Sequence, residues 1–357
     1  MSTPMLAALE ALVRVESPTE DLDACRDVVR LASDIATRVT GTPAQIIEHN
    51  GRPVFWWGAQ EPEIVLLAHL DTVWPKGSFE PLWEIKGDVL RGPGTFDMKA
   101  GFIQALFAIK DIKGSVALIG TTDEETGSKT SRDLIEKVSR AAKAVLVLES
   151  AIDGKVKVGR KGTSMYQIKV IGRAAHAGVE PEKGINATTE LAHIILGLAA
   201  LENKEHGTSV VPTTMKAGNS TNTVPDLAVL DIDARSFLQS ELVRIDKAIR
   251  EIKALHPEAK IEIGGGINRP PLELAATTAL YQRAKKVAEK IGMPELGSAS
   301  VGGASDGNFA GAVGAQVLDG LGAVGGGAHA PSEWISVAAL EERSNLLNAL
   351  VLDLINE

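Results

Sequence analysis

Two short apolar runs, residues 64–68 and 144–148, constrain the fold of this chain most strongly, because each ends at a side chain that can bind a metal. The first run is followed by His69 and the second by Glu149. Runs of this length are typical of strands buried in a parallel sheet. Because the carboxyl ends of such strands bring functional groups to one edge of the sheet, we expect His69 and Glu149 to lie there together.

Helical and strand-like segments alternate over the first 160 residues and again after residue 271. Helices are predicted over residues 4–15, 20–39, 98–112, 129–141, 276–292 and 336–355, and strands over 44–49, 53–58, 63–70, 115–122 and 144–148. This alternation predicts an α/β fold with a mainly parallel sheet covered by helices. The Gly-rich residues 301–327 are interpreted as tight loops around a site.

The rhythm changes between residues 162 and 271. The expected segments are a strand, a helix, two strands, a helix and a strand, at 164–171, 185–201, 208–217, 226–235, 241–255 and 260–264. This β-α-β-β-α-β order is that of a ferredoxin-like α+β domain. Glycines within 159–162 and 264–266 are interpreted as its flexible boundaries. We therefore expect one domain from residues 1–161 and 272–357, with residues 162–271 inserted as a second.

Composition excludes several classes of partner. A net charge of −9 without a basic run argues against nucleic acid or an anionic membrane surface. No stretch of about 18 apolar residues occurs, and the N-terminal residues lack the pattern of a signal peptide. The single cysteine, Cys25, excludes an intrachain disulfide. We expect a cytoplasmic protein that binds neither nucleic acid nor membrane.

The polar residues at the predicted strand ends are those of a hydrolytic site with two metal ions. On an extended strand His69 and Asp71 face the same side, so Asp71 is expected to orient the His69 ring. A His–Asp hydrogen bond without a metal is the alternative interpretation of this pair. Glu149 is the more telling residue, since a carboxylate at the end of a buried strand needs a partner.

Asp97 and the pair Glu124 and Glu125 each have a simpler interpretation when taken alone. Asp97 lies in a turn-rich run that opens a helix, where an aspartate commonly serves as the cap. Acidic loops such as that of Glu124 and Glu125 are usually only solvated. Because adjacent side chains on extended backbone diverge, one of the two can instead bind a metal while its neighbour faces a water. Their occurrence together with His69 and His329 favours the metal site.

Five strings along the chain resemble the di-zinc aminoacylase and glutamate carboxypeptidase family. The resemblance is closest to glutamate carboxypeptidases of the carboxypeptidase G type. The strings are HLDTV at 69–73, GPGTFDMK at 92–99, TDEETGS at 122–128, AHAG at 175–178 and GNSTNTVP at 218–225. They occur in the family's order across nearly the whole chain, which makes the set highly specific.

The resemblance implies two divalent metal ions. Zinc is expected, with cobalt and manganese as alternatives. Asp97 would be shared by both ions. The remaining ligands would be His69 and Glu149 for one ion, and Glu125 and His329 for the other.

The same resemblance assigns Glu124 as the general base and implies a cis peptide bond between Asp97 and Met98. It also implies that the insert is a lid and dimerisation domain, so a homodimer is expected. His176 in the insert would reach the active site of the partner subunit and stabilise the oxyanion that forms on the scissile carbonyl. A histidine of a surface loop is the alternative.

Three further residues match positions that bind substrate. Asn222 and Arg269 would hold its carboxylate, Arg269 as a planar two-point donor. Lys155 would contact an acidic side chain on the leaving amino acid. A plain surface role is the alternative for Arg269 and for Lys155. Other basic residues that lie close to Lys155 in the sequence are Lys157, Arg160 and Lys161.

The expected activity is metal-dependent hydrolysis of an amide bond that releases a C-terminal glutamate or aspartate. The substrate would be a small N-acyl or N-aroyl amino acid or a short peptide. The alternatives are a deacylase of acetylated or succinylated amino acids, an amidohydrolase of a small aromatic conjugate, and a non-catalytic binding homologue. Loss of a ligand or of Glu124 would mark the last of these, and none is lost.

Overall fold

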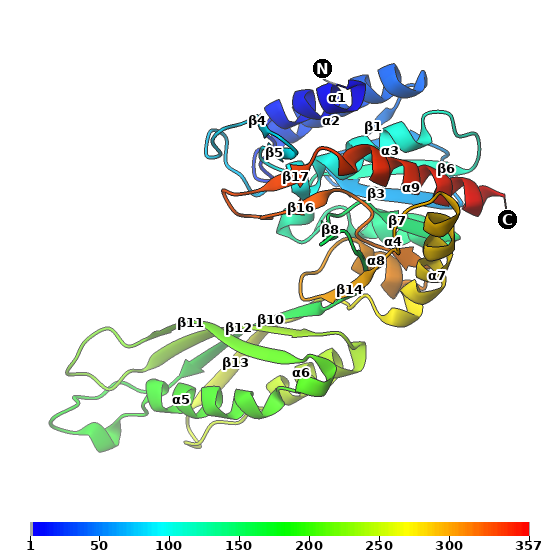
Figure 1. Ribbon diagram of the computed structural model, residues 1–357. Helices are drawn as coiled ribbons and strands as arrows, with labels where there is room; N and C mark the ends of the chain where they lie inside the picture. Colours follow the sequence, from blue (N-terminus) through cyan, green and yellow to red (C-terminus); the bar gives the residue numbers. More distant parts are fainter. Residues whose placement is uncertain (1–2, 357) are drawn as a thin grey trace. The chain divides into compact units, whose positions relative to one another are not determined.

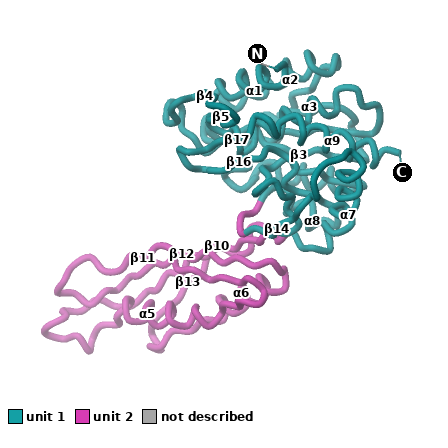
Figure 2. Tube along the Cα trace, viewed as in Figure 1, with its two compact units in different colours: residues 1–159, 272–301, 305–357 teal, residues 160–271, 302–304 magenta. Residues whose placement is uncertain are grey.

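The structure is a computed structural model that describes residues 3–356 and divides into two compact units (Figure 2). Unit 1 comprises Met1–Gly159, Leu272–Val301 and Ser305–Glu357. Unit 2 comprises Arg160–Pro271 and Gly302–Ala304. The chain therefore leaves unit 1 after Gly159 and returns to it at Leu272.

Unit 1 is built around a six-stranded sheet with the order β1-β2-β6-β3-β7-β15 (Figure 1). Its strands are β1 (Gln45–His49), β2 (Arg52–Gly58), β3 (Ile64–His69), β6 (Val116–Thr121), β7 (Ala144–Val147) and β15 (Val317–Leu318). The strands β6, β3, β7 and β15 run parallel, whereas β1 and β2 extend one edge in antiparallel fashion. Both β3 and β6 are buried along their whole length, which explains their continuous apolar sequences.

Helices pack on both faces of this sheet. They are α1 (Pro4–Arg14), α2 (Leu22–Thr40), α3 (Ala100–Ile109), α4 (Arg132–Ala141), α7 (Leu274–Lys290), α8 (Gly307–Ala312) and α9 (Ala339–Ile355). Successive residues of β3 face opposite sides of the sheet. Leu66 belongs to the core formed with α1, α2, α3 and α9, and Leu67 to the core formed with α4 and α8.

Unit 1 also holds short strands that the sequence pattern does not predict, because two or three residues carry too little periodicity. A five-stranded sheet is formed by β4 (Glu84–Lys86), β5 (Val89–Arg91), β17 (Trp334–Ser336), β16 (Val324–Gly326) and β8 (Ala151–Ile152). A separate pair is formed by β14 (Ser298–Val301) and β9 (Val156–Arg160). The pairing of β17 with β5 connects the chain before Asp97 to the chain after His329.

Unit 2 has the predicted β-α-β-β-α-β order. Its elements are β10 (Gly162–Ile171), α5 (Ala187–Leu198), β11 (Ser209–Ala217), β12 (Leu227–Ser236), α6 (Gln239–Arg250) and β13 (Lys260–Arg269). Short 3-10 turns lie at Pro181–Lys183, Ala199–Leu201 and Lys204–His206. The sheet order is β11-β12-β10-β13 with all neighbours antiparallel, and side chains of α5 and α6 pack against this sheet.

The glycines at 264–266 do not form the flexible boundary that the sequence predicts. They lie inside β13, which continues to Arg269 and pairs with β10 at Met165–Gln167. Gly265 has a φ of 86°, and a Cβ atom there would lie 2.1 Å from the backbone oxygen of Met165. Glycine is therefore required at this position by close approach of the two strands.

The predicted fold class is confirmed: an α/β unit with a mainly parallel sheet is interrupted by a ferredoxin-like α+β unit. Within residues 3–356, the longest apolar helices are too short or too polar to cross a membrane.

Candidate metal centre

Three neighbouring parallel strands of unit 1 end beside candidate ligands. His69 is the last residue of β3 and is buried. Glu149 follows β7 and is also buried, and Glu125 follows β6 in a short 3-10 turn at Glu124–Thr126. Because β6, β3 and β7 are adjacent and parallel, these residues gather at one edge of the sheet, as the sequence predicts.

Asp97 comes from a different segment, the π-helical turn Thr95–Lys99 that leads into α3. Asp97 and Met98 depart from helical backbone angles, and the peptide bond between them is cis, as the family resemblance implies. No side chain caps α3, whose N-cap residue is Lys99. The interpretation of Asp97 as a simple helix cap is therefore wrong.

The carboxylate of Asp97 lies between two imidazoles. Its Oδ1 atom is 3.3 Å from Nε2 of His69, and its Oδ2 atom is 3.3 Å from Nε2 of His329. The His69 Nε2 atom is also 3.7 Å from Oε1 of Glu149, and His329 Nε2 is 3.0 Å from Oε2 of Glu125. One carboxylate thus joins two groups of nitrogen and oxygen donors.

The ring of His69 is oriented by Asp71. Its Nδ1 atom lies 3.1 Å from the backbone oxygen of Asp71 and 3.4 Å from Oδ1 of the same residue. Since these oxygens only accept, Nδ1 carries a proton, and the ring is turned so that Nε2 faces Asp97. The other oxygen of Asp71 accepts hydrogen bonds from Thr19 Oγ1 at 2.7 Å and from the backbone N–H of Glu125 at 3.2 Å. Asp71 thereby fixes two of the candidate ligands.

Electrostatics at the cluster favour a bound cation. Burial raises the pKa of Glu125 to about 7, which reflects the cost of another negative charge there. Burial acts in the same direction on Asp97, but hydrogen bonds from His329 and His69 outweigh it and hold the pKa of Asp97 well below its usual range. Hydrogen bonds to Asp97 and Glu125 raise the pKa of His329 to about 10. Burial opposes a charge on His69, but hydrogen bonds to Asp71 and Asp97 outweigh it and raise the pKa of His69 as well. The carboxylates thus draw positive charge towards both imidazoles.

The donor set fits divalent metal ions. Imidazole nitrogen with carboxylate oxygen is a combination that zinc accepts, and cobalt and manganese accept it as well. Ligand atoms of His69, Asp97 and Glu125 lie within 4.8 Å of one another. Glu149 and His329 extend this group on its two sides through the contacts described above.

Glu124 and Glu125 do not lie on extended backbone, which corrects the sequence-based expectation. They begin the 3-10 turn, where successive side chains point about 120° apart. The two carboxylates therefore still diverge, for a different reason. Glu125 belongs to the group with His69 and Asp97, and Glu124 lies outside that group.

Lys155 and Lys157 differ in burial and in their contacts. Lys155 is exposed in the tight turn between β8 and β9, where its N–H donates to the backbone oxygen of Ile152. Lys157 is buried in β9, and its Nζ atom lies 3.7 Å from Oε2 of Glu149. Among these two lysines of the described chain, the ion pair with a candidate ligand is thus made by Lys157 and not by Lys155, the residue that the sequence predicts. The available signal was that Lys157 alone is flanked on both sides by valine, which indicates a buried strand.

His176, Asn222 and Arg269 belong to unit 2. The loops of His176 and Asn222 are paired, since the Ala177 N–H donates to the Asn222 oxygen at 2.9 Å, and both side chains are exposed. Nδ1 of His176 accepts from the Gly178 N–H at 3.1 Å, so the neutral ring carries its proton on Nε2. Arg269 ends β13 and is buried, which excludes a plain surface role.

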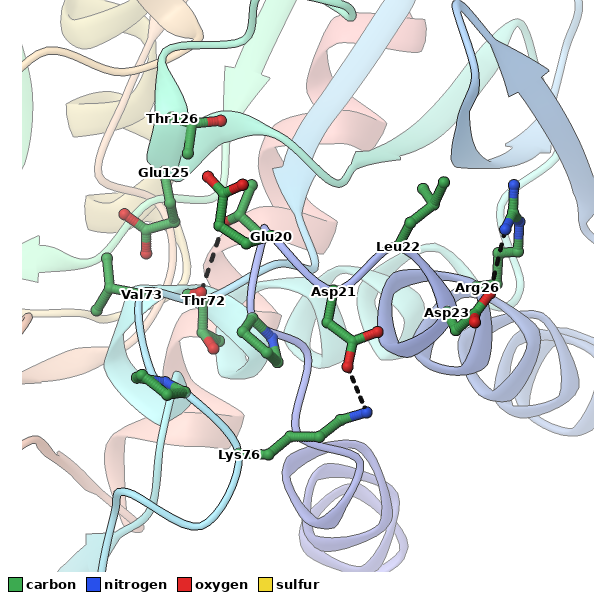
Figure 3. Close-up of a pocket in the computed structure, with 13 residues that line it drawn as sticks. Glu20, Asp21, Leu22, Asp23, Arg26, Thr72, Val73, Lys76, Glu125 and Thr126 are labelled. Atoms are coloured by element: carbon green, nitrogen blue, oxygen red, sulfur yellow. Dashed lines mark hydrogen bonds and ion pairs between the residues drawn. The ribbon is translucent and has the colours of Figure 1, made fainter.

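A cavity of about 900 Å³ adjoins Glu125 (Figure 3). Its lining consists of residues 18–23, 26, 72, 73, 75, 76, 125 and 126. Figure 3 shows two acidic side chains of this lining in ion pairs, Asp21 with Lys76 at 2.7 Å and Asp23 with Arg26 at 3.2 Å. Glu20 adds a carboxylate that has no ion pair within residues 3–356.

Imidazoles and carboxylates at the carboxyl edge of a parallel sheet define a metal-dependent hydrolase. Residues 65–353 match Peptidase family M20/M25/M40, and the chain belongs to this family of metallopeptidases. The family resemblance noted in the sequence is thereby confirmed.

Individual relatives cover most of the chain. Carboxypeptidase G2 of Pseudomonas sp. (strain RS-16) is 31% identical over 312 residues, which span 82% of this chain and 74% of that protein. Succinyl-diaminopimelate desuccinylase of Dechloromonas aromatica (strain RCB) is 28% identical over 98% of each chain. The crystal structure of aminopeptidase PepT from Bacillus cereus ATCC 10987 has the same fold, with a TM-score of 0.77 over 97% of each chain at 24% identity.

Proposed function

We propose that this protein hydrolyses an amide bond to release a C-terminal glutamate or aspartate from an N-acyl or N-aroyl conjugate or a short peptide. The observation that carries the reaction type is the Asp97 carboxylate, which faces His69 with one oxygen and His329 with the other. A shared carboxylate between two donor groups is what a pair of hydrolytic metal ions requires. The 31% identity to a carboxypeptidase supports the choice of substrate.

The centre would hold two ions, with zinc as the proposed metal and cobalt or manganese as alternatives. When bound, the ions polarise the scissile carbonyl and lower the pKa of a water molecule towards about 7. The proposed ligands are His69, Asp97 and Glu149 for one ion, and Asp97, Glu125 and His329 for the other.

Glu124 is proposed as the general base. It sits beside a proposed ligand, Glu125, yet outside the group formed with His69 and Asp97, which supports a role in proton transfer rather than in metal binding. It would take a proton from the attacking water and pass it to the nitrogen of the leaving amino acid. The neutral amine then leaves without a charged amide anion having formed.

His176 is proposed to stabilise the oxyanion through Nε2–H. Its tautomer supports this role, because the Gly178 N–H occupies Nδ1 and leaves a proton on the exposed nitrogen. We propose that the protein is a homodimer in which His176 serves the site of the partner subunit. Unit 2 would then act as both lid and dimerisation domain.

The leaving amino acid is proposed to be recognised by cationic and amide side chains. Arg269 and Asn222 would hold its α-carboxylate, with Arg269 as a two-point donor. Lys157 is proposed in place of Lys155, because Lys157 is buried beside the candidate ligand Glu149 whereas Lys155 lies on an exposed turn. An ammonium group 3.7 Å from Glu149 would favour an acidic side chain on the leaving residue over an apolar one.

The cavity beside Glu125 is proposed to receive the acyl group. Since Asp21 and Asp23 are neutralised by their ion pairs, Glu20 leaves the lining with excess negative charge. A neutral acyl or aroyl group suits such a lining better than a succinyl group, whose free carboxylate would be repelled. Deacylation of succinylated amino acids, which the 28% identical desuccinylase favours, is the second candidate function.

A panel of substrates tests this proposal. N-benzoyl-glutamate, N-benzoyl-alanine and N-succinyl-glutamate would be assayed for free amino acid with zinc, cobalt or manganese added to metal-free protein. We expect the highest kcat/KM for N-benzoyl-glutamate. A clear preference for the succinyl substrate would instead establish the deacylase.

The Arg269→Ala variant tests recognition of the α-carboxylate. Loss of a charged two-point contact in a desolvated site costs about 2 to 5 kcal/mol, so kcat/KM for N-benzoyl-glutamate should fall by roughly two to three orders of magnitude. The α-amide of the same substrate has no carboxylate to lose its partner, and it should respond far less. Equal losses on both substrates would assign Arg269 a structural role.

A further inference from the structure

A second buried carboxylate lies directly behind the Asp97 turn. Glu333 is 1% exposed and accepts four hydrogen bonds. Its Oε1 atom accepts from the backbone N–H groups of Phe96 at 2.8 Å and Asp97 at 3.1 Å. Its Oε2 atom accepts from the backbone N–H of Gly94 at 3.0 Å and from the indole N–H of Trp74 at 3.0 Å.

These four hydrogen bonds connect three segments that carry candidate ligands. Glu333 closes the loop of His329, in which the Glu333 N–H donates to the Ala330 oxygen at 2.9 Å. Trp74 lies five residues after His69, on the segment that continues from β3. The remaining donors belong to the turn of Asp97 itself. One carboxylate therefore connects the Asp97 turn and the His329 loop with the segment that follows His69.

The contacts require the anionic form and the full length of a glutamate. All four partners are N–H donors, so a proton on either oxygen of Glu333 would point at another proton. A glutamine would place its NH₂ group against two donors and lose two acceptor contacts. An aspartate is one methylene shorter and would not reach.

We propose that Glu333 is a positioning residue for the metal centre: it holds the backbone of the Asp97 turn so that the two carboxylate oxygens of Asp97 face the two histidines. This inference rests on the proposed metal centre and on none of the substrate assignments. Residues that orient metal ligands typically change metal affinity by about 10- to 100-fold when they are removed. Because Asp97 is shared, loss of Glu333 should weaken both sites.

The test is cobalt binding by metal-free protein, followed by visible absorption or calorimetry. Glu333→Gln should bind cobalt about 10- to 100-fold more weakly than the unaltered protein at both sites. The rise in Tm on adding cobalt should shrink as well, because stabilisation by a ligand depends on its affinity for the folded chain. A merely structural role would lower Tm equally with and without cobalt.

Glu190→Gln is the matched control. Glu190 is also a buried glutamate that accepts two backbone N–H groups, from Leu255 at 2.7 Å and His256 at 2.8 Å, but it lies in unit 2. The Glu190→Gln variant should have a lower Tm and an unchanged cobalt affinity.

A second variant keeps the test informative if Glu333→Gln does not fold. Trp74→Phe removes one of the four donors to Glu333 and retains a six-membered ring beside Phe79. It should weaken cobalt binding to a smaller extent.

Folded Glu333→Gln protein that binds two cobalt ions with unaltered affinity would overturn the proposal. So would a Trp74→Phe variant with unaltered affinity, in the case where only that variant folds. Failure of the unaltered protein to bind cobalt would be a different result, because it would remove the proposed metal centre itself. An unexpected substrate would leave the cobalt measurements unchanged.

Discussion

Asp97 and His69 face each other across 28 residues of sequence, with Oδ1 of the carboxylate 3.3 Å from Nε2 of the imidazole. The second oxygen of Asp97 is directed to His329 instead. Two oxygens with two separate partners are the geometric basis for assigning a shared ligand. Glu149, in comparison, lies beside His69, with its Oε1 atom 3.7 Å from Nε2 of that ring.

Metal stoichiometry should therefore respond differently to the two carboxylates. Asp97→Asn removes the shared charge and should reduce the metal content from two ions per chain towards none. Glu149→Gln removes a ligand from one site only and should leave about one ion. Elemental analysis after dialysis against a limiting zinc concentration measures both. Equal losses in the two variants would show that Asp97 is not shared.

Turnover should depend on Glu124, whereas the metal content of the protein should not. Glu124→Gln keeps the size of the side chain and removes its ability to accept a proton, so kcat should fall by about two to four orders of magnitude while two ions remain bound. Glu125→Gln is the matched control at the adjacent position and should lose metal together with activity. A Glu124→Gln protein that loses metal would belong in the ligand group.

The sequence predicts the main sheet and the positions of His69 and Glu149 at the strand ends, because both depend on local patterns. His69 and Glu149 follow apolar runs long enough to identify buried strands, and parallel neighbours must end at the same edge. The helix from Ala339 to Ile355 has a periodicity that is equally local. The short strands around the loop of His329 are not predictable in this way, because tertiary pairing alone selects them.

Activity should reappear when two inactive variants are combined, if His176 acts across a dimer. Glu124→Gln chains supply an intact histidine and His176→Ala chains an intact base, so a mixed dimer has one complete site. Co-expression with two affinity tags isolates that dimer, and free glutamate measures its turnover. Purified mixed dimers without recovered turnover would place His176 in its own subunit's site or outside catalysis.

Preference for an acidic leaving group should depend on Lys157 rather than Lys155. Lys157→Met keeps an unbranched side chain and removes the cation beside Glu149, so kcat/KM for N-benzoyl-glutamate should fall by about ten- to a hundred-fold relative to N-benzoyl-alanine. Lys155→Met is the matched control on the exposed turn and should change neither value. If the Lys155 variant loses the preference, the assignment from sequence was the better one.

Lys157 and Glu333 show where sequence reasoning ends. Four basic residues lie within 155–161, and the pairing of β9 with β14 places two of them, Lys157 and Arg160, in a buried strand. Glu333 follows His329 by four residues, but no periodic pattern connects it to Gly94 or Phe96. Both proposed roles depend on contacts between segments that are distant in sequence. No local sequence pattern predicts such contacts.

The most direct test of the account is a titration of metal-free protein with zinc in which bound metal and release of glutamate from N-benzoyl-glutamate are measured on the same samples. We expect no release without zinc, and a rate that reaches its maximum when about two ions are bound per chain. A maximal rate in the absence of metal, or release that stays at zero with both sites filled, would contradict the account.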